Sequence, residues 1–185
     1  MSEQVIQNVK ERMDKALQNL SRELATVRAG RAQPAMLDKV TVEYYGSPMP
    51  INQVAGITTP EPRLLVISPW EKSMLSEIEK AIQKSDLGLN PANDGSVIRL
   101  SIPVLTEERR QELVKQVRKM AEEARVAIRN IRRDGNDELK KAEKNGDVSE
   151  DEIRREMDKI QQVTDKSIAQ VDKLLEDKEK DVTQV

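Results

Sequence analysis

Residues 106–145 decide the fold, and they read TEERRQELVKQVRKMAEEARVAIRNIRRDGNDELKKAEKN. Apolar residues recur in this stretch at gaps of three or four residues, or sums of them, which is the period of one face of a long α-helix. These positions are Leu113, Val117, Met120, Ala124, Ile128, Ile131, Leu139 and Ala142. Thr106 is a good N-cap, and Asn145-Gly146 is a natural stop. At 1.5 Å a residue, the pattern predicts an unbroken rod of roughly 60 Å.

A stripe of arginines lies about a quarter turn from this apolar face. It consists of Arg118, Arg125, Arg129 and Arg132, which fall within a narrow arc at about 100° a residue. A guanidinium fork bonds two phosphate oxygens at once, so the stripe indicates a phosphate-binding face. The alternative is a solvated face whose arginines pair with nearby acids. Glu122 is the acid at the edge of the arc, and one carboxylate cannot neutralise four arginines, so we favour phosphate binding.

Two further apolar stripes predict two more helices. One covers residues 3–29, with Ser2 as its cap. The other begins at the capping box Ser149–Glu152, and its stripe, from Ile153 to Leu175, continues to near the end of the chain. Gly135 lies on the apolar stripe of the 106–145 helix, where glycine costs about 1 kcal/mol against alanine. We therefore expect a neighbouring helix to approach closely there, in preference to a kink. Three long helices predict an elongated three-helix bundle.

Residues 31–105 have a different architecture, because all eight prolines lie in this segment and proline is excluded from helix interiors. Short strands are predicted at residues 40–45, 54–58, 64–68 and 97–102. A helix is predicted at 74–84 with Ser73 as its cap, and a loop at 86–95. The fold class is therefore α+β, with a small α/β domain of residues 31–105 inserted into a discontinuous bundle of residues 1–30 and 106–185. Two single-chain crossings between the parts predict a hinge.

The aromatic residues are Tyr44, Tyr45 and Trp70. They form either a stacking platform for nucleic-acid bases or the core of the small domain, which has no other aromatic residue. We favour the core.

Composition excludes several kinds of function. The 185 residues carry a net charge of −2, so any nucleic-acid binding must come from a local patch. The absence of cysteine and histidine from the sequence removes thiol nucleophiles, Ser-His-Asp triads and the usual zinc sites. The glycines match neither a Walker loop nor a dinucleotide fingerprint. No apolar run approaches the roughly eighteen residues of a membrane span, and the N-terminus does not read as a signal peptide. We expect a soluble cytoplasmic protein with no cofactor, no metal, no membrane association and no enzymatic activity.

Five ordered blocks of the sequence resemble the bacterial ribosome recycling factors, and the resemblance runs from end to end. The blocks are Arg28-Ala29-Gly30-Arg31-Ala32 followed by Pro34, then Glu43–Gly46, Ser85–Pro91, Leu105–Arg110 and Arg125–Asp134. Departures from the family pattern are small: Ala29 and Gln33 stand where hydroxyl residues are expected, and Gly135 where alanine is expected.

The resemblance implies an L-shaped protein whose long arm is the bundle and whose short arm is a β/α/β sandwich. Arg129 and Arg132 match positions that contact ribosomal RNA in the family. With them, the candidate RNA-binding residues are Arg110, Arg118, Arg125, Arg129, Arg132 and Arg133. The candidate hinge residues are Arg28, Gly30, Arg31, Pro103, Val104 and Leu105.

The resemblance also implies a function and partners. The protein would bind, as a monomer, across the A and P sites of the large ribosomal subunit after termination. Elongation factor G, hydrolysing GTP, would then drive it to split the subunits and release them from mRNA. The alternative is a helical scaffold or chaperone-like protein with no RNA role, which would need neither the arginine stripe nor the inserted domain.

Overall fold

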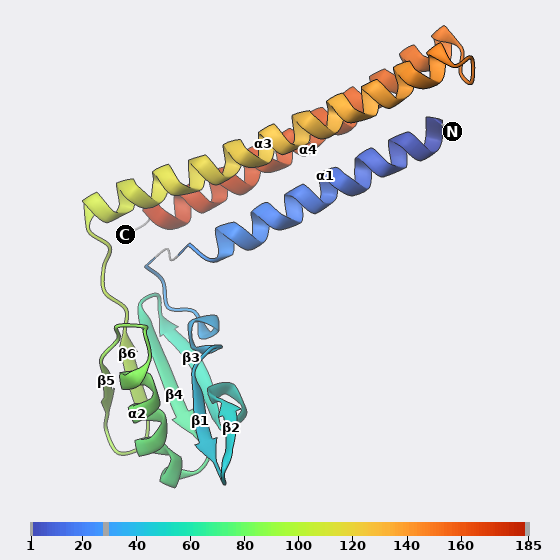
Figure 1. Cartoon of the computed structure of the whole chain (residues 1–185). Coiled ribbons are helices and arrows are strands. Elements are labelled where there is room, and N and C mark those ends of the chain that lie inside the picture. Colours follow the sequence, from blue (N-terminus) through green and yellow to red (C-terminus); the bar gives the residue numbers. More distant parts are fainter. Residues whose placement is uncertain (1, 28–29, 184–185) are drawn as a thin grey trace. The chain divides into compact units, whose positions relative to one another are not determined.

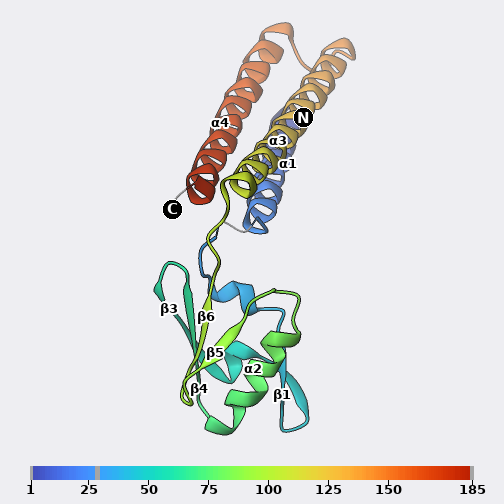
Figure 2. The same ribbon diagram turned by 90° about the vertical axis from the view of Figure 1, so that its left-hand side faces the viewer.

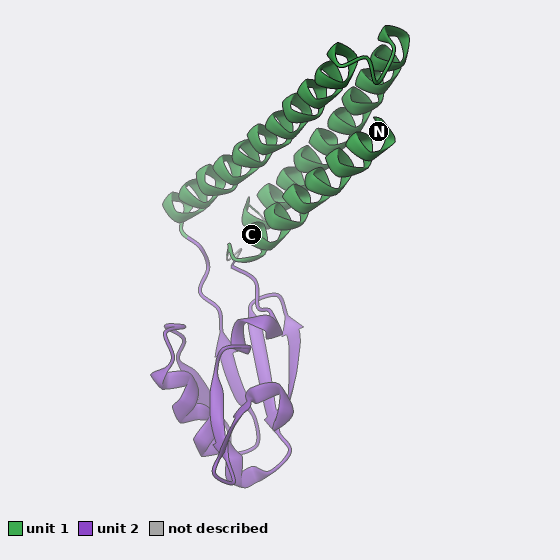
Figure 3. Cartoon of the chain, turned by 45° about the vertical axis from the view of Figure 1, so that its right-hand side comes forward, with its two compact units in different colours: residues 1–29, 106–185 green, residues 30–105 purple. Residues whose placement is uncertain are grey.

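The computed structural model of this protein describes residues 2–27 and 30–183. The chain divides into two compact units, shown in green and purple in Figure 3. Unit 1 comprises residues 1–29 and 106–185, and unit 2 comprises residues 30–105. The predicted fold class, a helical bundle with a small α/β domain, is confirmed.

Unit 1 consists of three helices, α1 (Ser2–Ala25), α3 (Glu107–Lys144) and α4 (Glu150–Thr183), which run alongside one another (Figures 1 and 2). The predicted caps of α3 and α4 are present. The hydroxyl of Thr106 accepts a hydrogen bond from the Arg109 N–H at 3.1 Å, and that of Ser149 accepts one from the Glu152 N–H at 3.2 Å. Gly146, with φ +79°, follows the end of α3 and lets the chain turn back into α4.

The first helix differs from its prediction at both ends. Ser2 lies within α1, and its hydroxyl donates to Glu152 Oε1 of α4 at 3.2 Å, so it joins two helices instead of capping one. The helix ends at Ala25, and the N–H groups of Thr26 and Val27 then bond to carbonyls three residues back, which tightens the last turn. Residues 28 and 29 of the predicted helix lie outside the described residues.

The helices of unit 1 approach one another closely at Gly135. A Cβ placed on Gly135 would lie 2.6 Å from Val9 Cγ2 of α1 and 3.1 Å from Ile160 Cδ1 of α4. The expected close approach is therefore confirmed, and α3 continues through this position without interruption.

Unit 2 contains two antiparallel sheets and one α-helix. The hairpin of β1 (Thr41–Tyr44) and β2 (Ser47–Pro50) forms the first sheet. The second has the order β3-β4-β6-β5, formed by β3 (Ala55–Glu61), β4 (Leu64–Pro69), β6 (Ile98–Ser101) and β5 (Pro91–Asn93). Helix α2 (Leu75–Lys84) contacts both β1 and β5, and short 3-10 helices cover Pro34–Leu37, Ile51–Gln53 and Lys72–Met74. The shared core is aliphatic, with fully buried Ile51, Leu65, Ile67, Ile78, Ile98 and Leu100.

Three predictions for unit 2 were wrong in detail. Strand β2, which follows Tyr45 and Gly46, was not predicted, and strand β5 lies inside the predicted loop 86–95. Both strands contain proline, which is confined to sheet edges and strand starts, and both are edge strands here. Tyr45 (φ 49°) and Gly46 (φ 82°) form a two-residue hairpin turn, in which both central residues need positive φ. Ser73 lies in a 3-10 helix, and the N-cap of α2 is Met74, which provides no side-chain cap.

Among the described residues, none of the helices combines the length and the apolar character that crossing a bilayer requires.

Candidate nucleic-acid interface

The arginine stripe of α3 faces acids of α4 that the sequence argument left out. Arg118 Nε lies 2.7 Å from Glu179 Oε1 of α4. Arg125 bonds to Asp172 Oδ1 of α4 through Nη2 at 2.6 Å and through Nε at 3.1 Å. The expectation that a single edge acid faces four arginines is therefore wrong, because the antiparallel neighbour supplies further carboxylates to the same face.

Arg125 is held by the bundle. Its side chain is 19% exposed, and its Nη1 also bonds to Glu122 at 3.1 Å. The hydrogen bond with Asp172, and then the one with Glu122, raise the pKa of Arg125 against the opposing effect of burial. With its nitrogens bonded to two carboxylates, this guanidinium is arranged to tie α3 to α4 more than to receive a phosphate.

Arg129, Arg132 and Arg133 form a second group, which we call the open cluster. Arg129 is 44% exposed, and its contact with Glu122 is a long one of 3.6 Å. Arg132 is half-buried and Arg133 is exposed, and within residues 2–27 and 30–183 neither makes an ion pair. Three neighbouring guanidinium groups with donors to spare are what a phosphate-binding surface requires.

Arg110 stands apart from both groups. It belongs to the first turn of α3, where its side chain is 14% exposed and lies 3.8 Å from Glu107. Its Nε is buried without a hydrogen-bond partner among the described residues. At about 100° a residue, Arg110 falls on the apolar side of α3, so it does not extend the open cluster.

The outward face of α3 carries lysines that the stripe argument did not include. Lys115, Lys119 and Lys140 are exposed and, at about 100° a residue, lie on the same side of the helix as Arg129 and Arg133. Val126, 47% exposed, lies at the middle of this face. The sequence carries a signal for this face, because bases outnumber acids along the arc, although its charges are more widely spread than those of the arginine stripe.

The candidate hinge residues lie where the chain enters and leaves unit 2. The Ala32 N–H donates to the carbonyl of Pro62 at 2.7 Å, and the Ile102 N–H donates to that of Arg63 at 2.8 Å. Both crossing segments are thus tied to neighbouring residues of the turn between β3 and β4. Gly30 has φ +71°, and a Cβ there would come within 3.1 Å of Leu105 Cγ.

The other hinge candidates differ in exposure. Arg31, Pro103 and Val104 are exposed, and Leu105 is half-buried. Arg28 lies outside the described residues.

The interpretation that the aromatic residues fill the core is wrong for Tyr45 and Trp70, which are 83% and 68% exposed. Tyr44 is half-buried, and its hydroxyl donates to Glu71 Oε1 at 2.6 Å, which is the main reason that its pKa is raised to about 12. The rings of Tyr44 and Tyr45 pack edge to face, with their centroids 4.5 Å apart. Leucine and isoleucine fill the core of unit 2, so the aromatic character of Tyr45 and Trp70 is a poor guide to their burial.

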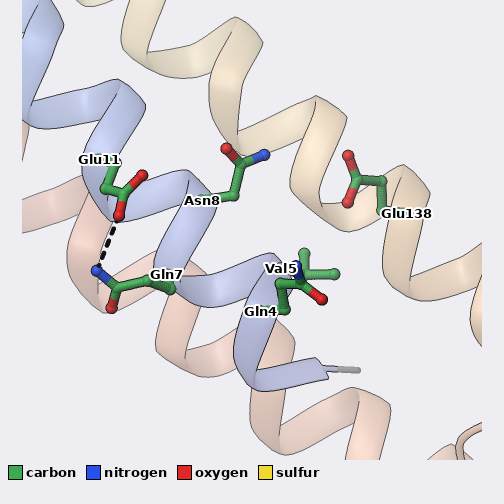
Figure 4. A pocket seen from close by; sticks show the side chains of 6 residues that line it. All are labelled: Gln4, Val5, Gln7, Asn8, Glu11 and Glu138. Carbon is green, nitrogen blue, oxygen red and sulfur yellow. Dashed lines mark hydrogen bonds between the residues drawn. The ribbon is translucent and has the colours of Figure 1, made fainter.

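A pocket of about 480 Å³ lies between α1 and α3 and is lined by Gln4, Val5, Gln7, Asn8, Glu11 and Glu138 (Figure 4). Two of these residues are joined by a hydrogen bond along α1, in which Gln7 Nε2 donates to Glu11 Oε1 at 3.3 Å. The lining of the pocket carries two carboxylates and no cation, so it does not suit a phosphate. The open cluster remains the better candidate.

Comparisons with known proteins all match this chain to ribosome recycling factors. The family model described as Ribosome recycling factor matches residues 20–182. The ribosome-recycling factors of Geobacillus sp. (strain WCH70) and Bacillus subtilis (strain 168) are 61% and 57% identical over 185 residues, covering 100% of both chains in each case.

Solved structures agree as well. A solution structure of the ribosome recycling factor matches with a TM-score of 0.76 and 41% identity, covering 100% of this chain and 98% of that one. A second match, with a TM-score of 0.64 and 48% identity and covering 100% of both chains, comes from models for the T. thermophilus ribosome recycling factor and the E. coli elongation factor G bound to the E. coli post-termination complex. On its fold, its length and these identities, the chain belongs to the ribosome recycling factor family.

Proposed function

We propose that this chain recycles ribosomes: it binds the large subunit of the post-termination ribosome and, with elongation factor G and GTP, splits the subunits and releases them from mRNA. The observation that carries the proposal is full-length similarity to a recycling factor described, with elongation factor G, in models of both factors bound to a post-termination complex. The family consists of non-enzymatic translation factors, and the chain acts by binding. This recycling of ribosomes takes place in the cytoplasm, where ribosomes are found.

The bundle is the RNA-binding part in this proposal. It lies across the A and P sites, and the open cluster of Arg129, Arg132 and Arg133 contacts phosphates of the ribosomal RNA. Arg118 and Arg125, paired with acids of α4, serve chiefly to hold the two helices together. The lysines of the outward face of α3 add charge that attracts RNA without specifying its sequence.

Unit 2 acts as the moving part. The two crossing segments are short, and each is anchored to unit 2 by a backbone hydrogen bond, at Ala32 and at Ile102. Motion about Gly30–Arg31 and Pro103–Leu105 therefore leaves the fold of unit 2 intact, because hinges are short segments that absorb changes of dihedral angle. Elongation factor G would drive this motion.

Cosedimentation with isolated large ribosomal subunits at several salt concentrations tests the RNA-binding face. The variant R129A/R132A/R133A removes the open cluster, so its affinity should fall and the slope of log K against log salt should shrink by about 2 to 3, at roughly 0.9 per phosphate contact. The matched control is R154A/K173A/K180A, which removes the same charge from cations of α4 that pair within their own helix. Equal losses for the two variants would show that only net charge matters and would overturn the proposed face.

A further inference from the structure

Helices α3 and α4 are joined by a regular ladder of ion pairs. Its rungs are Arg118–Glu179 at 2.7 Å and Arg125–Asp172 at 2.6 Å. The two arginines are seven residues apart in α3, and the two acids are seven residues apart in α4 in the opposite direction. That is the repeat expected of antiparallel helices packed side by side, as these are (Figure 1).

One more step of this register brings Arg132 opposite Asp165. Arg132 is half-buried, as Arg125 is, and the helices remain close at this level, since Gly135 and Ile160 approach each other within the next turn. Arg132 and Asp165 nevertheless form no ion pair with each other. Asp165 Oδ1 accepts a hydrogen bond from Gln161 Nε2 of its own helix at 2.8 Å, and Arg132 makes no ion pair among the described residues.

We propose that Gln161 is a positioning residue for RNA binding: by holding the carboxylate of Asp165 on α4, it leaves the guanidinium of Arg132 available for phosphate. This inference rests on the proposed function of the open cluster. In this proposal, the side chains of α4 determine which arginines of α3 are available to bind RNA. Glu179 and Asp172 occupy Arg118 and Arg125, and Gln161 keeps the third acid away from Arg132.

The physical reason is competition between two anions for one cation. A carboxylate and a phosphate both bond the fork of N–H donors on a guanidinium, and an acid already placed opposite has the advantage of proximity. A hydrogen bond between residues four apart on a helix restrains the acid's side chain. Removing the amide of Gln161 frees Asp165 to close the third rung as the first two are closed.

The test measures binding to isolated large ribosomal subunits over a range of salt for Q161A, with Q162A as the matched control. Gln162 is the adjacent exposed glutamine, and its side chain makes no hydrogen bond within the described part of the chain. We expect Q161A to lose about two- to fivefold in affinity at low salt, the range of one exposed ion pair, and the salt slope to fall by about one. Q162A should bind like the parent protein.

A double-mutant cycle identifies the acid responsible. In the D165N background the effect of Q161A should vanish, because no third carboxylate remains to compete. The NMR signal of the Arg132 Nε–H group, recorded without ribosomes, gives a second readout: it should differ between Q161A and Q161A/D165N but not between the parent and D165N.

Two outcomes separate this inference from the proposed function. If R132A loses binding while Q161A binds like Q162A, the positioning role of Gln161 is wrong and the RNA-binding face stands. If R132A binds like the parent, the contact of Arg132 with phosphate is wrong and the positioning role falls with it. Melting curves of each variant show whether a loss of binding comes from unfolding.

Discussion

The buried surface of unit 1 includes Glu156, Thr164 and Ser167 of α4 and the small residues Ala121 and Gly135 of α3. In the described part of unit 2 no polar side chain is buried, and leucine, isoleucine and valine make up most of the core. Both cores are mainly aliphatic, but the helices of the bundle also approach one another at small residues, whereas the core of unit 2 is a single concentrated cluster of large aliphatic groups. The contacts that stabilise unit 1 are spread along its length, whereas those that stabilise unit 2 are concentrated at its centre.

Truncating one fully buried aliphatic residue in each unit is the strongest way to challenge this comparison. Ile128→Ala in unit 1 and Ile67→Ala in unit 2 should each cost about 2–5 kcal/mol, because each leaves a cavity. Hydrogen exchange read residue by residue should show I128A exposing amides of the bundle alone and I67A those of the sandwich alone. If either variant exposes both units to the same extent, they unfold together and the comparison fails.

Adding a methyl group at Gly135, where three helices approach closely, tests the dependence of the bundle on small residues. Gly135→Ala gains about 1 kcal/mol of helix propensity, but its Cβ meets the stiff side chain of Val9 at 2.6 Å. Overpacking costs about 1–3 kcal/mol, so we expect a net loss of about 1 kcal/mol in urea unfolding. The double variant V9A/G135A should be more stable than the sum of the two single changes predicts; simple additivity would show that the two residues do not compete for space.

Two arginines of one stripe allow a finer test within unit 1. Arg125→Ala breaks bonds to Asp172 and Glu122 at a half-buried position and should lower the free energy of unfolding by about 1 kcal/mol. Arg132→Ala, one rung further along α3, should leave it nearly unchanged, because Arg132 has no ion pair among the described residues. Thermal melting of both variants measures the difference. Equal destabilisation would place Arg132 among the structural residues.

The smallest expected effect concerns how unit 2 responds to acid. Asp94 accepts hydrogen bonds from the backbone N–H groups of Val97 and Ser96 and from Arg99, and these hold the pKa of Asp94 well below its ordinary value of 3.8. A lowered pKa means that this contribution to stability is present above about pH 4 and is lost as pH falls through the lower folded value. Asp94→Asn should therefore reduce the acid sensitivity of the sandwich in NMR-monitored titrations, while amides of the bundle respond as in the parent protein.

Much of unit 1 followed from the sequence, because periodicity and caps both act locally. The span of α3 was predicted to within a residue at each end, with Thr106 and Gly146 in their expected roles. In unit 2 the sequence predicts the four strands that contain β-branched residues, β1, β3, β4 and β6, but not the short edge strands β2 and β5. The exposure of Tyr45 and Trp70 depends on which residues had already filled the core, and no local pattern records that.

The candidate site was predictable in part for the same reason. The arginine stripe is a property of one helix, and it was visible at once. Its division into paired arginines and an open cluster depends on how α4 lies against α3. A signal did exist, since Asp165, Asp172 and Glu179 repeat every seven residues as Arg118, Arg125 and Arg132 do, but it is meaningful only once the two helices are known to be neighbours.

The anchoring of both crossing segments at Pro62 and Arg63 has a mechanical consequence. Any tension carried along the chain into unit 2 arrives at a single corner of the sheet, beside the turn between β3 and β4. From Ile102 it runs lengthwise along β6, whose ladder with β4 spans Leu64–Ser101 to Ile67–Ile98. A ladder pulled along its strands shares the load among its hydrogen bonds, whereas one peeled from its end breaks them one by one. The ladder between β4 and β6 therefore resists such a pull with its hydrogen bonds acting together.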